Sequence, residues 1–263
     1  MFRGNHLKSA LLAGGRCIGA WLFSGSPVAG EILGLQGFDA LVIDQEHTAH
    51  GPETTVAQMR AIAAAGPATI LVRVPDGESR TIKLALDSGA EGIVVPTVES
   101  AEEARAIVAA CRYPPDGRRG AHHTVARAAD WGRSSAEYLH HYSAELLIIA
   151  MIESERGLNA AADIAAVEGI DMLFLGPLDL SASFGCMGDF ADPHIADAAD
   201  HVAHACARRG KWAGSTAFPG FSASRLFALG HGFVTLGSDV TFLQAGAAAS
   251  LREVEETTCN PAK

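Results

Sequence analysis

Short apolar runs recur along the chain, and each is separated from the next by a stretch of helical length. Most runs are apolar on both faces, which is typical of parallel strands covered by helices on each side. The intervening stretches, such as ESAEEARAIVAACR at 99–112, carry helical periodicity. The eight strand candidates are IGAWLF at 18, ALVID at 40, TILVRV at 69, GIVVPTV at 92, LLIIAMIE at 146, DMLFLG at 171, KWAGSTAF at 211 and GFVTLG at 232.

This regular order of strand and helix predicts an α/β fold, a single (β/α)8 TIM barrel that takes up the whole chain, residues 1–263. No Pro/Gly/Ser-rich linker or shift in composition divides the sequence into two domains. An open, doubly wound sheet is the alternative architecture. It is disfavoured because no G-x-G-x-x-G follows the first strand, and because eight strands in this length close naturally.

Composition and charge exclude several classes of partner. The formal net charge is −10 and Lys and Arg do not cluster, so we expect no nucleic-acid binding. No segment reaches the roughly 18 consecutive apolar residues of a membrane span, so we expect no membrane partner. The odd number of cysteines and the lack of a CxxC pair predict reduced thiols that serve as packing residues in a cytoplasmic protein. These are Cys17, Cys111, Cys186, Cys206 and Cys259.

Polar residues gather where the predicted strands end. In a barrel of this type, function is found at the carboxyl ends of the strands, because all eight ends meet at one mouth. The residues that follow or close the apolar runs should therefore converge on one site. They are Asp44, Glu46 and His47 after the second strand, Arg73 in the third, Glu153 after the fifth and Asp179 after the sixth.

Glu153 and Asp179 are candidate metal ligands. Neighbouring parallel strands lie about 4.8 Å apart, so carboxylates just beyond the fifth and sixth strands can reach a common point. Two unpaired carboxylates at one point repel each other, which either raises the pKa of one of the two carboxyl groups or favours binding of a cation. A site made only of oxygen ligands suits Mg²⁺ or Mn²⁺. The alternative is that Glu153 pairs with Arg156 and that Asp179 only caps a helix.

The turn GPLDLS, at 176–181, adds an anion-binding element. Gly176 permits close approach of the backbone, and the helix that follows exposes N–H groups around Leu178 and Asp179. These groups could hold a substrate carboxylate.

Arg73 is the only basic residue in the core of a predicted strand. A permanently charged, forked donor at a barrel mouth suits an enolate or carboxylate oxygen. A structural ion pair with Glu46 or Asp44 is equally compatible with the sequence.

His47 is the candidate proton carrier. A carboxylate near a histidine fixes its tautomer, so Asp44 and His47 could act together if the chain leaves the strand near Asp44. A structural histidine is the alternative. Schiff-base chemistry is disfavoured because none of the four lysines, at 8, 83, 211 and 263, follows a predicted strand. A serine or cysteine nucleophile is disfavoured because no G-x-S-x-G is present.

These motifs together resemble the HpcH/HpaI family of metal-dependent pyruvate aldolases. The segments LVIDQEH, VRVP, RYPPDGRRG, AMIESERGL, GPLDLS and FVTLGSDVTFL occur in the family's order between about residues 18 and 250. The resemblance implies a barrel that binds Mg²⁺, Mn²⁺ or Co²⁺ and acts on a 2-keto acid and an aldehyde. It also implies a homohexamer, a trimer of dimers in which the C-terminal helix is exchanged between subunits.

By motif position, the resemblance also implies roles for individual residues. Glu153 and Asp179 match the metal ligands, Arg73 the contact to the pyruvyl oxygen, and His47 with Asp44 the acid/base pair, supported by Glu46. Residues of the glycine turn match the substrate-binding backbone: Gly176, Pro177, Leu178 and Asp179. The implied reaction is reversible retro-aldol cleavage of a 4-hydroxy-2-oxo acid through a metal-stabilised pyruvate enolate.

Two features depart from the family pattern. Met151 stands where many relatives carry Gln, and His122 and His123 follow Arg118-Arg119 where small residues are usual. Met151 is expected to line the substrate pocket. The His pair is expected either to contact the aldehyde, in the site of a neighbouring subunit, or to lie in a solvated loop. A lyase for malyl- or citramalyl-CoA thioesters and a non-catalytic barrel that binds keto acids remain alternative functions.

Overall fold

Eight parallel strands close into a barrel in the order β1 to β8, as the pattern of apolar runs predicts. The computed structural model describes residues 3–258. Every predicted strand is present, and each observed start and end lies within three residues of the predicted one. The strands are β1 (Cys17–Leu22), β2 (Ala40–Asp44), β3 (Thr69–Arg73), β4 (Gly92–Val95), β5 (Leu147–Ile152), β6 (Met172–Leu175), β7 (Trp212–Thr216) and β8 (Phe233–Ser238).

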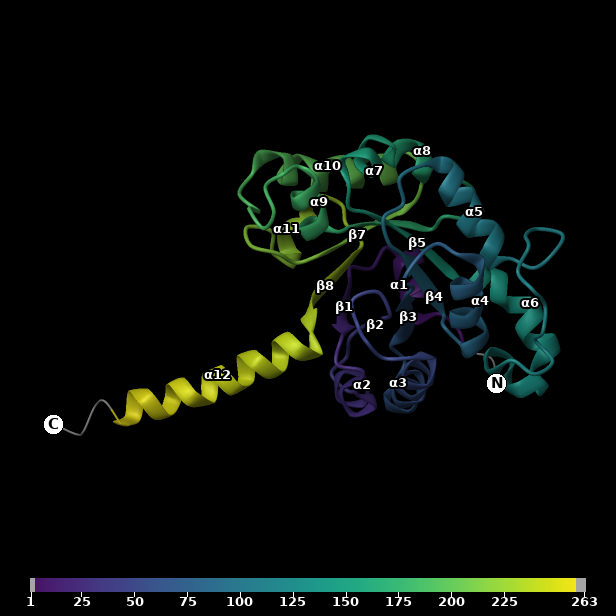
Figure 1. Ribbon diagram of the computed structural model, residues 1–263, viewed down its shortest axis with the longest axis horizontal. Coiled ribbons are helices and arrows are strands. Elements are labelled where there is room, and N and C mark those ends of the chain that lie inside the picture. Colours follow the sequence, from purple (N-terminus) through teal and green to yellow (C-terminus); the bar gives the residue numbers. More distant parts are fainter. Residues whose placement is uncertain (1–2, 259–263) are drawn as a thin grey trace.

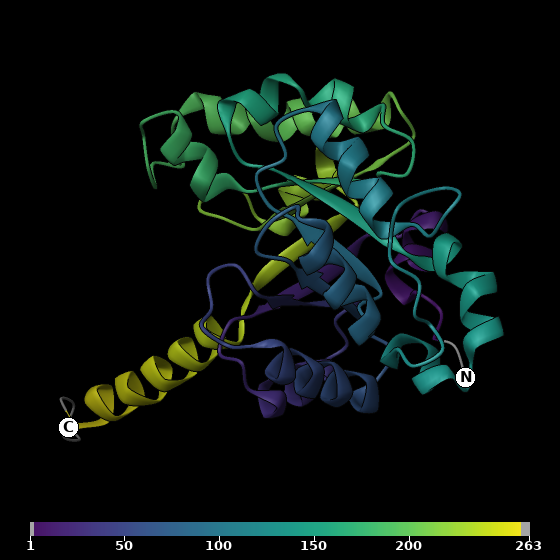
Figure 2. The same cartoon turned by 45° about the vertical axis from the view of Figure 1, so that its right-hand side comes forward.

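Helices surround the barrel and connect its strands (Figures 1 and 2). No helix among residues 3–258 is long and apolar enough to span a membrane. The helices are α1 (His6–Leu12), α2 (Pro27–Gly34), α3 (Pro52–Ala65), α4 (Ser79–Ser88), α5 (Ala101–Cys111), the 3₁₀ helix η1 (Arg127–Gly132), α6 (Ser135–Glu145), α7 (Glu155–Asn159), α8 (Ala161–Ala165), α9 (Pro177–Ser183), α10 (Pro193–Ala207), α11 (Ala223–Ala228) and α12 (Asp239–Thr258).

The core has two layers, which explains why the strands are apolar on both faces. One cluster fills the space between the barrel and its helices and includes Ile43, Val72 and Ile148. The other fills the barrel interior and includes Val42, Leu71 and Ile149. Successive side chains of a strand point to opposite faces, so the side chain two positions after an interior residue also points inward. This alternation aims Asp44 of β2, Arg73 of β3 and Met151 of β5 at the barrel axis.

The cysteines behave as packing residues where the structure describes them. Cys17, Cys111 and Cys206 are buried and Cys186 is half-buried, and all four are free thiols. Burial raises the pKa of Cys17, Cys111 and Cys206 to about 12, so these thiols stay protonated. Cys259 lies outside the described residues.

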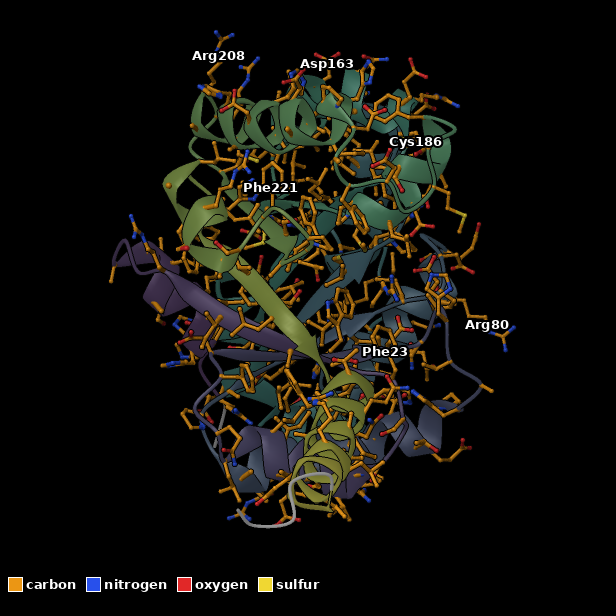
Figure 3. The ribbon with its side chains drawn as sticks, turned by 90° about the vertical axis from the view of Figure 1, so that its left-hand side faces the viewer. Phe23, Arg80, Asp163, Cys186, Arg208 and Phe221 are labelled. Atoms are coloured by element: carbon orange, nitrogen blue, oxygen red, sulfur yellow. The ribbon has the colours of Figure 1, made fainter. Side chains whose placement is uncertain are left out.

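Helix α12 projects away from the barrel. It begins directly after β8 and leaves the rest of the molecule, as Figures 1 and 2 show, while Figure 3 looks along it. Phe242, near its start, stacks on Phe38 with ring centroids 6.2 Å apart. Further along, Leu243 and Leu251 are 75% and 67% exposed. The helix therefore presents large apolar side chains that its own barrel does not cover.

Candidate active site

Asp44 and Arg73 form the centre of a polar cluster at the carboxyl end of the barrel. The register of β2 and β3 places the two residues directly opposite each other. Both side chains are buried, and Nε of Arg73 donates a hydrogen bond to Oδ1 of Asp44. Nη1 of Arg73 lies 3.0 Å from Oε2 of Glu46, and its guanidinium lies 4.7 Å from the centre of the Trp21 ring. Arg73 is thus fixed by two carboxylates and an aromatic face.

The chain leaves β2 at Asp44, as the polar end of the strand predicts. The carboxylate of Asp44 accepts hydrogen bonds from the backbone N–H of His47, at 2.8 Å, and of Glu46, at 3.4 Å. This turn brings His47 back over the mouth of the barrel. Asp44 therefore holds both Arg73 and the loop that carries the histidine.

The ring of His47 faces Glu46. Its Nε2 lies 3.7 Å from Oε2 of Glu46, and the side chain is 58% exposed. Burial raises the pKa of Glu46, with Asp44 and Asp179 adding to the effect and Arg73 and His47 opposing it. The predicted Asp44–His47 pair is thus joined through the backbone of His47, and the carboxylate nearest its ring is Glu46.

Glu153 has one satisfied and one unsatisfied carboxylate oxygen. Oε1 accepts hydrogen bonds from the backbone N–H of Thr97, at 2.7 Å, and from its hydroxyl, at 3.0 Å. Oε2 is buried and has no hydrogen-bond partner in the described part of the chain. Burial raises the pKa of Glu153, and the charges of Glu46 and Asp179 raise it further against the opposing bonds from Thr97. A buried carboxylate oxygen without a partner is stabilised by binding a cation or a proton.

Gly176 lies directly against Glu153. A Cβ atom at position 176 would lie 2.5 Å from Oε2 of Glu153 and 3.3 Å from the methyl carbon of Met151. Only glycine leaves that oxygen uncovered, so the free side of the Glu153 carboxylate opens toward the start of α9. Met151, 3% exposed and part of the interior cluster, forms the floor beneath it.

Asp179 lies in the first turn of α9, which begins with Pro177. Its side chain is exposed, and its charge acts on both Glu153 and Glu46. The residue at the N-cap is Gly176 and no side chain caps this end, so Asp179 is not the helix cap. The backbone N–H groups at the start of α9 are left available for a ligand.

The donor set of Glu153 and Asp179 fits a divalent cation. Neither side chain has the structural role that was its alternative. Arg156 pairs with Glu99, at 3.3 Å, and not with Glu153, and Asp179 does not cap α9. Within residues 3–258, no group of three or more His, Cys, Asp and Glu side chains forms a ready metal-binding cluster. A cation held by these two carboxylates would complete its shell with water or substrate oxygens, which is the arrangement that Mg²⁺ favours.

His122 and His123 lie at the other end of the barrel from this cluster. They belong to the connection between α5 and β5, which returns the chain to the amino end of the strands. Nδ1 of His123 bonds to the hydroxyl of Ser135, and its ring packs edge-on against Tyr113. His122 is exposed and lies 3.2 Å from the hydroxyl of Thr124. The pair therefore does not line the site of its own chain.

The sequence-based prediction missed two residues of the cluster. Thr97 holds Glu153 from the end of β4, and Trp21 supports Arg73 from β1. Thr97 lies inside the predicted run GIVVPTV at 92–98, whereas the strand of the structure ends at Val95, so the rule that selects polar residues after strands would have found it only with the correct strand end. Trp21 lies inside an apolar run, and no signal in the sequence separates it from an ordinary core residue.

The chain is similar to known proteins over almost its whole length. A model of the HpcH/HpaI aldolase/citrate lyase family matches residues 17–245. A hydroxypyruvate/pyruvate aldolase from Deinococcus radiodurans is 39% identical over 98% of this chain and 93% of its own length. A 5-keto-4-deoxy-D-glucarate aldolase from Shigella dysenteriae is 38% identical over 90% of this chain and 91% of its own.

A solved structure supports the same relationship. An HpcH/HpaI aldolase/citrate lyase family protein from Burkholderia cenocepacia superimposes with a TM-score of 0.90 at 36% identity. The match covers 95% of this chain and 99% of that one.

Proposed function

Because this chain belongs to the HpcH/HpaI aldolase/citrate lyase family and is an aldolase-type carbon–carbon lyase, we propose that it is a metal-dependent class II pyruvate aldolase. Its reaction is the reversible cleavage of a 4-hydroxy-2-oxo acid to pyruvate and an aldehyde. The observation that carries the proposal is the buried Oε2 of Glu153, which has no hydrogen-bond partner among residues 3–258 and whose carboxyl group is influenced by the charge of Asp179.

Glu153 and Asp179 would hold the cation, with Mg²⁺, Mn²⁺ and Co²⁺ as candidates. A bound divalent ion would act as a Lewis acid that polarises the 2-keto group of the substrate. The two carboxylates would fix its position, since Thr97 orients Glu153 and the backbone of α9 orients Asp179.

Arg73 would stabilise the negative charge that develops on the C2 oxygen when the C3–C4 bond breaks. Its guanidinium is held in place before substrate arrives, by Asp44, Glu46 and Trp21. A donor that is already oriented stabilises developing charge without reorganisation at the moment of reaction.

His47 would move the proton of the 4-hydroxyl group. Its ring is at the mouth, 58% exposed, and is anchored through its backbone by Asp44. Glu46 lies beside the ring and would orient it, because Nε2 faces Oε2 of Glu46. In the direction of synthesis the same ring would return a proton to the new hydroxyl group.

The start of α9 and the floor of the site would bind the keto acid. The uncapped backbone N–H groups at Leu178 and Asp179, after Gly176 and Pro177, suit the substrate carboxylate. Met151 would supply the apolar surface under the pyruvyl methyl carbon, since it lies beneath Gly176.

A retro-aldol panel tests the function, the metal and the substrate together. We expect several 4-hydroxy-2-oxo acids to release pyruvate, measured with a coupled dehydrogenase, only when Mg²⁺, Mn²⁺ or Co²⁺ is returned to chelator-treated protein. Malyl-CoA and citramalyl-CoA are included, and their preferred cleavage would favour the CoA-thioester lyase. A protein that neither cleaves the panel nor exchanges the C3 protons of pyruvate in D₂O with any metal would be a non-catalytic barrel.

We also propose that α12 is exchanged between subunits of a homo-oligomer, a hexamer built from dimers. The exposed Leu243 and Leu251 support this, because α12 leaves its own barrel with these side chains uncovered. We expect Leu243→Glu with Leu251→Glu to shift the sedimentation mass toward that of one 27.4 kDa chain. Leu12→Glu, a change at a 72% exposed leucine of α1, is the control. An unchanged mass in the double variant would rule the exchange out.

The His122–His123 loop would then reach the aldehyde site of a neighbouring subunit. This proposal rests on the exchange, because the pair lies at the far end of its own barrel from Glu153.

A cytoplasmic location is likewise a proposal, supported by the free thiols of Cys17, Cys111 and Cys206.

A further inference from the structure

Thr97 has a strained backbone at the point where it contacts the candidate metal ligand Glu153. It lies two residues after the end of β4 and has a φ of 48°, in the left-handed region. A threonine is unfavourable there, because its branched side chain crowds the backbone. Strain of this kind persists only where the surrounding structure holds it, and it is concentrated at active sites and ligand clamps.

The strained turn aims two successive N–H groups at the same neighbour. The N–H of Thr97 donates to Glu153, directly after β5, and the N–H of Val98 donates to the carbonyl oxygen of Met151 in β5, at 3.1 Å. Successive N–H groups of a regular strand point in opposite directions, whereas a left-handed residue turns them to one side. Val98 is also buried, which fixes the turn in place. The strain at Thr97 therefore accompanies the contact with Glu153.

Both donors of Thr97 act on one oxygen of Glu153. The backbone N–H lies 2.7 Å from Oε1 and the hydroxyl lies 3.0 Å from the same atom. A carboxylate oxygen has two lone pairs, so these two hydrogen bonds use the acceptor capacity of Oε1. Oε2 is buried and accepts no hydrogen bond from residues 3–258. Glu153 therefore presents one free oxygen to a cation, and not two.

The number of free carboxylate oxygens distinguishes between divalent cations. Ca²⁺ takes about six to eight oxygen ligands in a flexible shell, and one carboxylate can supply two of them. Mg²⁺ is smaller and requires a near-octahedral shell, in which it keeps several waters. One oxygen from each of two carboxylates suits the second kind of shell. Loss of the second Glu153 oxygen therefore disfavours Ca²⁺ more than it disfavours a smaller ion.

We propose that the hydroxyl of Thr97 sets the cation preference of the site, because it restricts Glu153 to one ligating oxygen and so disfavours Ca²⁺ relative to Mn²⁺. The inference rests on the proposed function, in which Glu153 and Asp179 hold the cation. Thr97 is a positioning residue, since it acts through Glu153. Its backbone N–H remains when valine, alanine or serine replaces it, and its side chain is exposed, so such changes test the hydroxyl with little effect on packing.

Competition between Mn²⁺ and Ca²⁺ measures this preference without an activity assay. The EPR signal of free Mn²⁺ gives its dissociation constant for chelator-treated protein, and added Ca²⁺ then displaces the bound Mn²⁺. We expect the wild type to bind Mn²⁺ at one site and to bind Ca²⁺ more weakly. In Thr97→Val the ratio of the Ca²⁺ to the Mn²⁺ dissociation constant should fall about tenfold, because Oε1 of Glu153 regains a lone pair.

Three further variants separate the hydroxyl from the rest of the side chain. Thr97→Ala removes the hydroxyl without keeping a branched side chain and should match Thr97→Val. Thr97→Ser keeps the hydroxyl and should retain the wild-type ratio. Thr81→Val is the matched control, because the hydroxyl of Thr81 in α4 also donates to a carboxylate, that of Asp76 at 2.7 Å, which is not a candidate metal ligand. It should leave both dissociation constants unchanged.

The outcomes distinguish this inference from the proposed function. If the wild type, Thr97→Val and Thr97→Ala all bind Mn²⁺ with the same ratio, the hydroxyl does not set the preference, and the metal site itself stands. A ratio that falls in Thr97→Ser as far as in Thr97→Val would also overturn the inference, because the hydroxyl is then not the cause. A wild type that binds no Mn²⁺ would overturn the metal site and this inference together.

Discussion

Glu153→Gln is expected to lower kcat for pyruvate release by about 10³-fold and, at the same time, to raise the melting temperature. The amide has nearly the same shape as the carboxylate, and its oxygen can still accept the two hydrogen bonds from Thr97. What the change removes is the negative charge of the buried Oε2, which has no partner in the described part of the chain. Activity should fall because the metal is lost, whereas stability should rise because an uncompensated charge is lost.

The stability effect has a defined pH dependence. The pKa of Glu153 is raised in the folded protein, so the unfolded chain releases this proton more readily. The stability that protonated Glu153 contributes is fully present below the ordinary glutamate pKa of 4.5 and is lost as pH rises through the folded pKa. The gain in melting temperature of Glu153→Gln over wild type should therefore grow from pH 4 to pH 8.

Metal binding supplies a readout that does not require activity. We expect Mn²⁺ to raise the melting temperature of the wild type and to leave that of Glu153→Gln unchanged, because ligand binding to the folded state alone stabilises it. Glu155→Gln, two residues further along and exposed on α7, is the control and should behave as wild type. Full activity of Glu153→Gln in chelator-treated protein would show that Glu153 is not a metal ligand.

The sequence-based rule about strand ends succeeds for Asp44, Arg73, Glu153 and Asp179 for a physical reason. All strands of a parallel barrel end at one mouth, so the order of the chain alone determines that these residues share it. The same topology determines that a connection from a helix to the next strand lies at the opposite end. It therefore places His122 away from the site of its own chain.

Side-chain contacts are less predictable than strand ends. The sequence leaves open whether Arg73 pairs with Asp44 or with Glu46, and the structure contains both ion pairs. That outcome depends on the register of β2 and β3 and on rotamers, neither of which has a signature in one sequence. The ring of His47 turns toward Glu46 for the same reason, since the turn after Asp44 uses the Asp44 carboxylate to hold backbone N–H groups. A direct contact between that carboxylate and the ring does not follow from their spacing.

His47→Ala is expected to lower kcat for retro-aldol cleavage by about 10²- to 10⁴-fold, the usual contribution of a positioned general acid/base. The KM for the keto acid should change little, because the ring is proposed to transfer a proton and not to hold the pyruvyl group. The melting temperature should also stay the same, since the side chain is 58% exposed and its anchor to Asp44 is a backbone N–H that alanine keeps. Steady-state kinetics and a thermal melt check these three expectations.

Exchange of the C3 protons of pyruvate in D₂O, measured beside the cleavage rate, tests whether His47 or its neighbour Glu46 transfers the proton. His140→Ala, which removes an exposed histidine of α6, is the control and should keep wild-type kcat. If His47→Ala keeps both the cleavage rate and the exchange rate, His47 is not the proton carrier. Glu46 would then take its place, because burial raises the pKa of this carboxyl group and brings it closer to that of a general base at neutral pH. In that case Glu46→Gln in the His47→Ala background should lower the rate further and remove the dependence of the rate on pH that Glu46 contributes. Loss of the ion pair between Glu46 and Arg73 alone would lower the rate without changing the pH profile.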